Sequence, residues 1–196
     1  MLMNFRISFF TIALGLFSLN SVYSQDDIAD ARNNFNVGQT VTVTGVVTNG
    51  AELGSIRYIQ DETAGIAIYP GFDWNDLPFV PQPGDEITVT GELTEFASLL
   101  EVGPSISSMS LVSSGNELPQ PIVLTPAQFD ETYEGMLVEV VDAVFDDGGA
   151  SFGSSTYTFQ AQNETGVIYV RNGSPLIGEL VPLGQIQMLG ILSQFS

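Results

Sequence analysis

The chain has 196 residues, of which 44% are hydrophobic, and 23 acidic residues oppose four arginines for a formal net charge of −19. It contains no histidine, cysteine or lysine. This inventory excludes catalysis by a histidine base, a cysteine nucleophile or a lysine Schiff base, and it excludes P-loops and the common zinc sites. We therefore expect no enzyme activity and no cofactor within these residues, and any catalytic domain would lie beyond Ser196.

The first 24 residues have the order of a secretory signal peptide. Arg6 supplies a positive charge, an apolar run covers 7–19, and small residues precede a predicted cleavage after Ser24. As a helix, the run would rise only about 20 Å, too little for a hydrocarbon core roughly 30 Å thick, so a membrane anchor is the weaker interpretation. We expect a mature protein that starts at Gln25, is secreted or held at the cell surface, and has no membrane span.

Beyond the predicted cleavage site three arginines oppose all 23 acidic residues, which is a net charge of −20. Such a charge keeps a protein soluble and repels anionic partners at long range. The simplest interpretation is a solvated acidic surface suited to salty extracellular water. A protein that binds polyanions usually carries a basic stripe, and this sequence has none.

The mature chain begins with a predicted short helix over 26–34, where acidic caps precede an Ile-Ala-Ala pattern. Short β-rich runs separated by turn residues then predict five strands, near 39–48, 54–60, 65–70, 85–94 and 98–112. The prolines of 70–83 exclude a regular strand or helix there, so this segment is a predicted loop.

A stretch rich in Gly, Ser and Pro follows, and it predicts a linker over 115–124. Thr125 and Pro126 are an N-cap and first-turn pair, which predicts a second short helix over 125–133. Four further strands are expected near 136–146, 155–161, 166–171 and 184–193. The expected domains are therefore 25–114 and 125–196, joined by the linker.

The two predicted domains repeat the same landmarks about 100 residues apart. Three pairs of segments match: 38–45 with 135–142, 58–69 with 157–170, and 84–96 with 184–195. A fixed period with matching landmarks indicates a duplicated structural unit.

The second copy stops one residue after Phe195, the equivalent of Phe96, whereas the first copy continues through another strand. We expect the second barrel to lack its last strand, which would leave an open sheet edge of the kind that native proteins avoid. We also expect this chain to be the N-terminal piece of a longer protein, with downstream domains as its partners. A second copy that naturally has four strands is the alternative.

Four segments resemble the OB-like domains of secreted bacterial proteins, of the type found beside extracellular nucleases: TVTGVVT (42–48), YIQDETAGIAIY (58–69), GDEITVTGELTEF (84–96) and LLEV (99–102). TPAQFDETYEGMLVEV (125–140) is similar to the junction before a second such domain in tandem members. The resemblance covers essentially the whole mature chain, although Gln162 and Asn163 depart from the usual Gln-Asp-Glu turn. It implies an all-β protein of two tandem OB-like five-stranded barrels, and a nucleic-acid-binding module beside a catalytic domain elsewhere in the chain.

OB barrels bind single strands on the face of their second and third strands, with aromatic side chains as stacking platforms. Trp74, in a polar loop between Asp73 and Asn75, is the best candidate for an exposed contact, although its acidic neighbours would repel phosphate. For the tyrosines, packing within strands is the simpler interpretation. The candidate ligand-binding residues are Arg57, Tyr58, Tyr69, Phe72, Trp74, Tyr157, Tyr169 and Arg171.

Acidic residues gather at three places in the sequence: Asp26, Asp27 and Asp30; Asp130, Glu131 and Glu134; and Asp142, Asp146 and Asp147. Oxygen ligands suit calcium, and extracellular calcium sites can be weak, but no cluster has the spacing of an EF-hand. Solvated acid is the default interpretation, and a weak calcium site is the alternative.

Three classes of function stay open for the chain. It is a binding module for single-stranded nucleic acid in an extracellular nuclease, a carbohydrate- or protein-binding accessory module of a cell-surface protein, or a spacer. OB barrels also take oligosaccharides, and aromatic loops with few basic residues suit a neutral sugar better than a phosphate chain.

Overall fold

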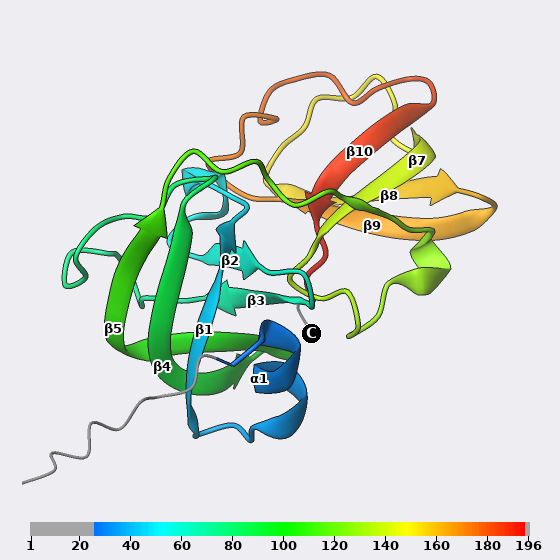
Figure 1. Ribbon diagram of the computed structural model, residues 1–196. Coiled ribbons are helices and arrows are strands. Elements are labelled where there is room, and N and C mark those ends of the chain that lie inside the picture. The colour runs from blue at the N-terminus through cyan, green and yellow to red at the C-terminus, as the bar shows by residue number, and fades with distance from the viewer. Residues whose placement is uncertain (1–25, 195–196) are drawn as a thin grey trace, which may run out of the picture.

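A computed structural model describes residues 26–194, and the predicted signal peptide with its cleavage site lies outside them. The described chain is mostly β-strand, arranged as a closed barrel and a second sheet (Figure 1). We call the part from α1 (Ile28–Asn34) through β5 (Leu99–Ser113) the first unit, and the part from β6 (Ile122–Val123) through β10 (Ile186–Ile191) the second unit. No helix within 26–194 is long and apolar enough to cross a membrane.

The barrel of the first unit closes in the strand order β1-β2-β3-β5-β4. Neighbouring strands are antiparallel except β3 and β5, which pair in parallel, so β5 closes the barrel by pairing with both β3 and β4. A short 3₁₀ turn, η1 (Ala51–Leu53), lies between the first two strands. The remaining strands are β1 (Thr40–Val47), β2 (Arg57–Gln60), β3 (Gly65–Ile68) and β4 (Glu86–Phe96).

The alternation of apolar and polar residues in β1 and β4 explains the core of this barrel. Side chains of a strand point to opposite faces in turn, so every second residue faces inward. The residues that alternate with them face outward, and among these the hydroxyls of Thr42 and Thr90 are hydrogen-bonded at 2.9 Å. The inward set is Val41, Val43, Val47, Ile87, Val89 and Leu93, all at most 2% exposed.

Helix α1 adds to the same core from one end of the barrel (Figure 1). Ile28 and Ala31, on one face of the helix, are completely buried. The backbone N–H of Ile28 donates to the Asp61 carboxylate at 2.8 Å, so the turn between β2 and β3 satisfies a free N–H of the first helical turn.

The second unit repeats most of this strand order. Its sheet runs β10-β7-β8-β9, which is the pattern β4-β1-β2-β3 of the barrel, and β6 pairs with β7 in parallel. Within the described residues no strand joins β9 to β10, so these two strands form the ends of the sheet. The strands are β7 (Leu137–Phe145), β8 (Ser155–Ala161), β9 (Glu164–Val170) and β10.

Each of the nine strands expected from the sequence has a counterpart, and the first expected helix is α1. The prediction of a helix over 125–133 is wrong beyond the first turn of that segment. Only a 3₁₀ turn forms, η2 (Pro126–Gln128), in which the Thr125 N–H donates to Gln128 Oε1 at 2.9 Å. Phe129 is already extended, with ψ of 100°, because the chain must leave the helix to carry Glu134 and Gly135 against the first unit.

Candidate functional site

The outer face of β2 and β3 in the first barrel is covered by the second unit. Tyr58 and Ala67, which pair across the two strands, are 4% and 0% exposed. They form an apolar cluster with Ile56 and Leu99, and Ile191 of β10 packs against it. This face therefore offers no surface to a ligand while the two units are together.

Hydrogen bonds also join the second unit to this face of β2 and β3. The hydroxyls of Tyr58 and Ser193 are 2.8 Å apart, and the Leu137 N–H donates to Gln60 Oε1 at 2.8 Å. Burial raises the pKa of Tyr58, which the bond to Ser193 partly offsets. The start of β7 and the chain after β10 are thus fastened to β2.

The strands β8 and β9 repeat β2 and β3 at an offset of 100 residues. The opposite residues Phe159 and Gly166 correspond to the opposite residues Ile59 and Ile66. The inward and outward positions of β8 and β9 therefore match those of β2 and β3. A Cβ built on Gly166 would lie 2.2 Å from Phe159 Cζ, so the phenyl ring occupies the space where a side chain would begin. By this offset Thr158 corresponds to Tyr58, and Val167 to Ala67.

The equivalent outer face of the second unit is open. Val167 is 59% exposed and Tyr169 is 64% exposed, whereas Ala67 at the place of Val167 is fully buried. Arg171, directly after β9, is exposed and lies next to Gly54 of the first unit. We call this surface the β8–β9 face, and it consists of Thr156, Thr158, Gln160, Thr165, Val167, Tyr169 and Arg171.

Aromatic packing supports the β8–β9 face from inside. Phe159 and Phe152 both meet Phe145 edge to face, with ring centroids 6.2 Å and 5.6 Å apart. Tyr157 packs against Phe152 in the same way at 4.8 Å. Because such pairs add to the free energy of burial, we expect the backbone that presents Tyr169 to be well fixed.

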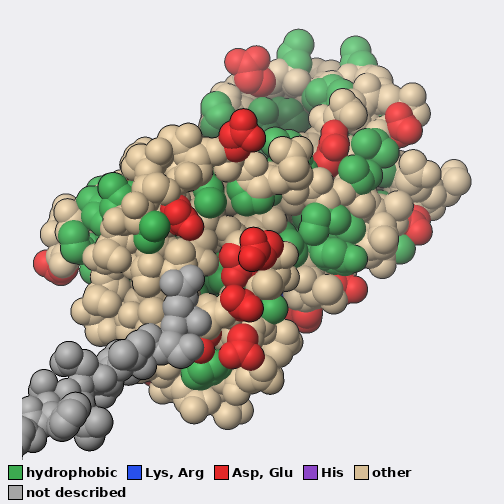
Figure 2. Space-filling view, in the orientation of Figure 1, with side chains coloured by type: hydrophobic (Ala, Val, Ile, Leu, Met, Phe, Trp, Pro, Cys, Tyr) green, Lys and Arg blue, Asp and Glu red, His purple; other side chains and the backbone are tan. Residues whose placement is uncertain are grey.

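The charges around the β8–β9 face limit the ligands that it can bind. Arg171 is the last basic residue of the sequence and the only one in the second unit. The neighbouring strand β7 carries exposed Asp142. Asp146, directly after β7, is also exposed, and its N–H donates to the Thr158 carbonyl at 3.1 Å. Figure 2 shows further acidic side chains spread over both units. The face therefore favours ligands with few closely spaced negative charges.

Two residues expected to contact a ligand are buried together in the first barrel. Trp74 is 6% exposed, and its indole N–H donates to the Ser55 carbonyl at 2.8 Å, so the expectation that it is an exposed contact is wrong. Arg57 is 2% exposed and lies 5.8 Å from the Trp74 ring centre. Burial lowers the pKa of Arg57, whose guanidinium donates to the Gly54, Ile56 and Pro81 carbonyls.

The other predicted site residues separate into buried and open positions. Tyr58 and Tyr157 are at most 9% exposed and pack inside the molecule. Tyr69 is half-buried after β3, and Phe72 is 98% exposed in the loop after it. Of the eight, only Tyr169 and Arg171 lie on the β8–β9 face.

The sequence analysis missed the five remaining residues of this face: Thr156, Thr158, Gln160, Thr165 and Val167. None of them is aromatic or basic, so none has the character expected of a nucleic-acid contact. The signal that could have found them is the repeat itself, because the offset of 100 residues assigns each an outward position.

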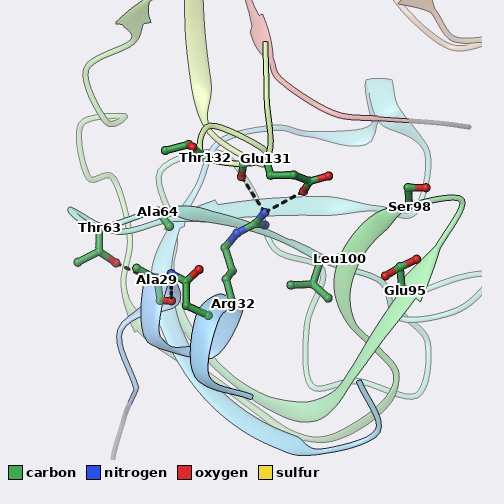
Figure 3. Close-up of a pocket in the computed structure, with 10 residues that line it drawn as sticks. Ala29, Arg32, Thr63, Ala64, Glu95, Ser98, Leu100, Glu131 and Thr132 are labelled. Atoms are coloured by element: carbon green, nitrogen blue, oxygen red, sulfur yellow. Dashed lines mark hydrogen bonds and ion pairs between the residues drawn. The ribbon is translucent and has the colours of Figure 1, made fainter. Parts of the chain in front are cut away.

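A polar hollow at the junction of the two units lies beside an ion-pair network. Arg32 of α1 donates to the Glu134 carboxylate at 3.0 Å. It also donates to the Glu131 carbonyl at 3.1 Å (Figure 3). Glu134 is 2% exposed, and burial raises its pKa while Arg32 opposes that shift. Its Oε1 atom has no hydrogen-bond partner. We interpret this network as a link that holds the two units together.

Metal binding is not supported by any cluster in the described chain. Among residues 26–194 no three acidic side chains are arranged so that they could hold a metal ion. The weak calcium binding expected from the sequence stays a prediction.

Comparison with known proteins finds similarity to a bacterial endonuclease. No family model matches the chain. Endonuclease YhcR from Bacillus subtilis is 28% identical over 184 residues, which are 87% of this chain and 15% of that protein. The chain thus spans about one seventh of the length of this relative.

Comparison with solved structures gives matches of low similarity. The hypothetical protein ygiW from E. coli is 18% identical over 45% of this chain and 90% of its own, with a TM-score of 0.34. A putative aspartyl-tRNA synthetase from Leishmania major Friedlin is 11% identical over 54% of this chain and 23% of its own, with a TM-score of 0.38.

Proposed function

We propose that the chain is a non-catalytic accessory module of a secreted protein that acts on nucleic acid, and that its β8–β9 face contacts a single strand. One observation carries the proposal: the outer strand face that is buried in the first barrel is open in the second unit. The similarity to part of Endonuclease YhcR supports a role beside a nuclease domain. The signal-peptide pattern of the first 24 residues supports export.

We infer that both units are OB-like, and that residues 26–194 contain four of the five barrel strands of the second unit. A five-stranded barrel with the order β1-β2-β3-β5-β4 fits the OB-fold, in which ligands lie on strands two and three. The order β10-β7-β8-β9 supports the same assignment for the second unit. The domains 25–114 and 125–196, with the linker 115–124 between them, follow from this assignment.

Tyr169 is the residue on which the proposed contact depends. An exposed aromatic ring on a sheet can stack on a base, a contact worth about 1–3 kcal/mol, and Val167 beside it extends the apolar surface. Arg171 can pair with one phosphate. A single such pair gives a slope of only about −0.7 in the plot of log affinity against log salt. We therefore expect weak binding with a shallow dependence on salt.

In this proposal the catalytic residues lie in another domain of the protein. A chain without histidine, cysteine or lysine lacks histidine bases, cysteine nucleophiles and lysine Schiff bases, and its acidic residues are scattered along the sequence. The acidic side chains of 26–194 do not gather at a metal site that could activate water. Hydrolysis would then come from another domain of the protein, which this module helps to place on its substrate.

A neutral oligosaccharide is the second candidate ligand for the same face. The observation that favours it is the polar character of the face: Thr156 is directly opposite Tyr169, Thr158 is opposite Val167, and Asp146 pairs with the backbone of Thr158. Sugar hydroxyls can donate to the carboxylate of Asp146, whereas phosphates are repelled by it.

A titration with three ligand classes tests the proposal. The chain from Gln25 is mixed with fluorescent oligo(dT), with a neutral polysaccharide and with buffer alone at several salt concentrations. We expect oligo(dT) to bind, and Tyr169→Ala to weaken that binding by about 5- to 150-fold, the equivalent of 1–3 kcal/mol. Tyr169→Phe should keep the affinity because it keeps the ring.

Leu183→Ala is the matched control, because Leu183 is 81% exposed and lies off the β8–β9 face. Binding of the polysaccharide alone would support the second candidate. Binding of neither ligand would leave a spacer role and overturn the proposal. Binding of oligo(dT) that is unchanged by Tyr169→Ala would exclude this face as the contact.

A further inference from the structure

The sequence contains two Asn-Gly dipeptides, Asn49-Gly50 and Asn172-Gly173. In such a pair the backbone nitrogen of the glycine can attack the amide carbon of the asparagine side chain, because glycine has no Cβ to obstruct the approach. The reaction converts the asparagine into an acid and so adds a negative charge. It requires that the asparagine amide and the glycine N–H can both move, and the two dipeptides differ in this respect.

Asn49 and Gly50 are held in place within the first barrel. Asn49 is 3% exposed, and its amide donates to the carbonyls of Gly50 and Ile56 at 3.1 Å and 3.0 Å. Its Oδ1 atom accepts the Tyr58 N–H at 2.6 Å. The Gly50 N–H donates to the Glu52 carboxylate at 2.8 Å, so the attacking nitrogen is held as well. Both reacting groups of this dipeptide are therefore fixed.

Asn172 and Gly173 are exposed in a turn directly after β9. The Ser174 N–H donates to the Arg171 carbonyl at 3.0 Å, so the dipeptide occupies the two central positions of the turn. Within 26–194 neither the Asn172 side chain nor the Gly173 N–H has a hydrogen-bond partner. A Cβ built on Gly173 would have no atom within 4 Å, so the space beside it is open. Both reacting groups of this dipeptide can therefore move.

We propose that Asn172 is a site of spontaneous deamidation, which places a new carboxylate beside Arg171 at the end of the β8–β9 face. The Gly173 nitrogen gives its proton to a base and bonds to Asn172 Cγ. The bond from Cγ to Nδ2 breaks, and Nδ2 leaves as ammonia. The cyclic imide then adds one water molecule, which gives aspartate or isoaspartate at position 172. The step involves no oxidant or reductant.

The position of Asn172 gives the new charge a consequence. Arg171 is the only basic residue of the second unit, and a carboxylate at the next residue offsets part of its charge. The effect on a ligand rests on the proposed function. If Arg171 pairs with a phosphate, the modification should weaken binding of a single strand by up to about fivefold, the scale of one exposed ion pair.

Mass spectrometry of the chain from Gln25 tests the proposal. The folded protein is kept at 37 °C at pH 6, 7.5 and 9 and digested in acid with pepsin, and the peptides that contain Asn49 and Asn172 are compared. We expect conversion at Asn172 at a rate that rises with pH, because a base takes the Gly173 proton. Conversion at Asn49 should be at least about tenfold slower, because three hydrogen bonds of its side chain must first open.

Unfolding provides the matched control, because the two dipeptides have the same chemistry once the fold is lost. In urea the rates at Asn49 and Asn172 should become similar. Asn172→Gln keeps an amide on a longer side chain and should stay unconverted in the folded protein. Asn172→Asp imitates the product, and it should bind fluorescent oligo(dT) more weakly than Asn172→Gln does.

Two results would overturn the modification site. The first is conversion of Asn49 and Asn172 at equal rates in the folded protein. The second is conversion of Asn172 in urea but not in the folded protein. Equal binding of oligo(dT) by Asn172→Asp and Asn172→Gln would overturn the effect on the ligand. No binding of oligo(dT) by any variant would refute the proposed function, whereas conversion at Asn172 in the same samples would still support the modification site.

Discussion

Gly65 and Gly135 meet backbone to backbone where the two units join. A Cβ built on Gly65 would lie 2.3 Å from the carbonyl carbon of Gly135, and one built on Gly135 would lie 2.7 Å from that of Gly65. Gly135 also has a φ of +80°, a conformation that favours glycine. The junction therefore accepts a side chain at neither position.

Gly135→Ala should destabilise the protein far more than the same change at Gly38, its equivalent in the first unit. Gly38 has a φ of +92° but no atom within 4 Å of the position of a Cβ, so Gly38→Ala measures backbone strain alone, about 1–2 kcal/mol. Gly135→Ala adds the collision with Gly65, and we expect a total loss of about 3 kcal/mol or more. Urea denaturation measures both, and equal losses would contradict the contact.

Much of the fold could be predicted from the sequence because the repeat preserves its landmarks. The glycines at 38 and 135, the Gln at 60 and 160, and the alternation in 40–47 recur at nearly constant spacing. Since alternation fixes which residues face inward, the inner residues of these strands could be expected from the sequence, and the repeat carries the same expectation to the second unit.

The covered and open faces could not be predicted, because they depend on contacts between the units. Ile191 and Ser193 cover Tyr58, whereas Thr158 at the equivalent position is accessible. The sequence around these two positions does not indicate this difference. Trp74 is flanked by polar residues that indicate exposure. It is buried because Ser55 accepts its N–H and Arg57 lies over its ring.

Trp74 is the single tryptophan, so fluorescence reports its burial directly. We expect emission typical of an apolar environment, little quenching by acrylamide, and a red shift on unfolding. Trp74→Ala should cost about 3–5 kcal/mol of stability, because a large buried side chain is removed. Phe72→Ala, at a residue 98% exposed in the same loop, is the control and should stay within about 0.5 kcal/mol. Strong quenching of the folded protein would show that Trp74 is exposed.

Glu101 should make the protein less stable at neutral pH than in mild acid. It is 5% exposed, and burial raises the pKa of its carboxyl above the ordinary value of 4.5, while a hydrogen bond from Thr94 opposes the shift. A carboxyl whose pKa is raised in the folded state stabilises that state when the pH is below the ordinary pKa. This contribution is lost as the pH rises through the raised pKa.

Glu101→Gln removes the buried charge and keeps the shape of the side chain. The variant should be more stable than the unsubstituted protein at pH 7, and the difference should shrink toward pH 4, where Glu101 is protonated. Glu117→Gln, at an exposed residue, is the control. Urea denaturation at pH 4, 5.5 and 7 measures the differences, and a gain that is the same at all three values would argue against this account.

Thiol labelling distinguishes the covered strand face of the first barrel from the open, equivalent face of the second unit. The chain has no cysteine, so Ala67→Cys and Val167→Cys each introduce a single thiol at equivalent positions of the two units. Reaction with a maleimide is followed in the folded protein and in urea. We predict that the thiol at 167 reacts at nearly its unfolded rate and that the thiol at 67 is strongly protected. Equal rates at the two positions in the folded protein would contradict this difference between the faces.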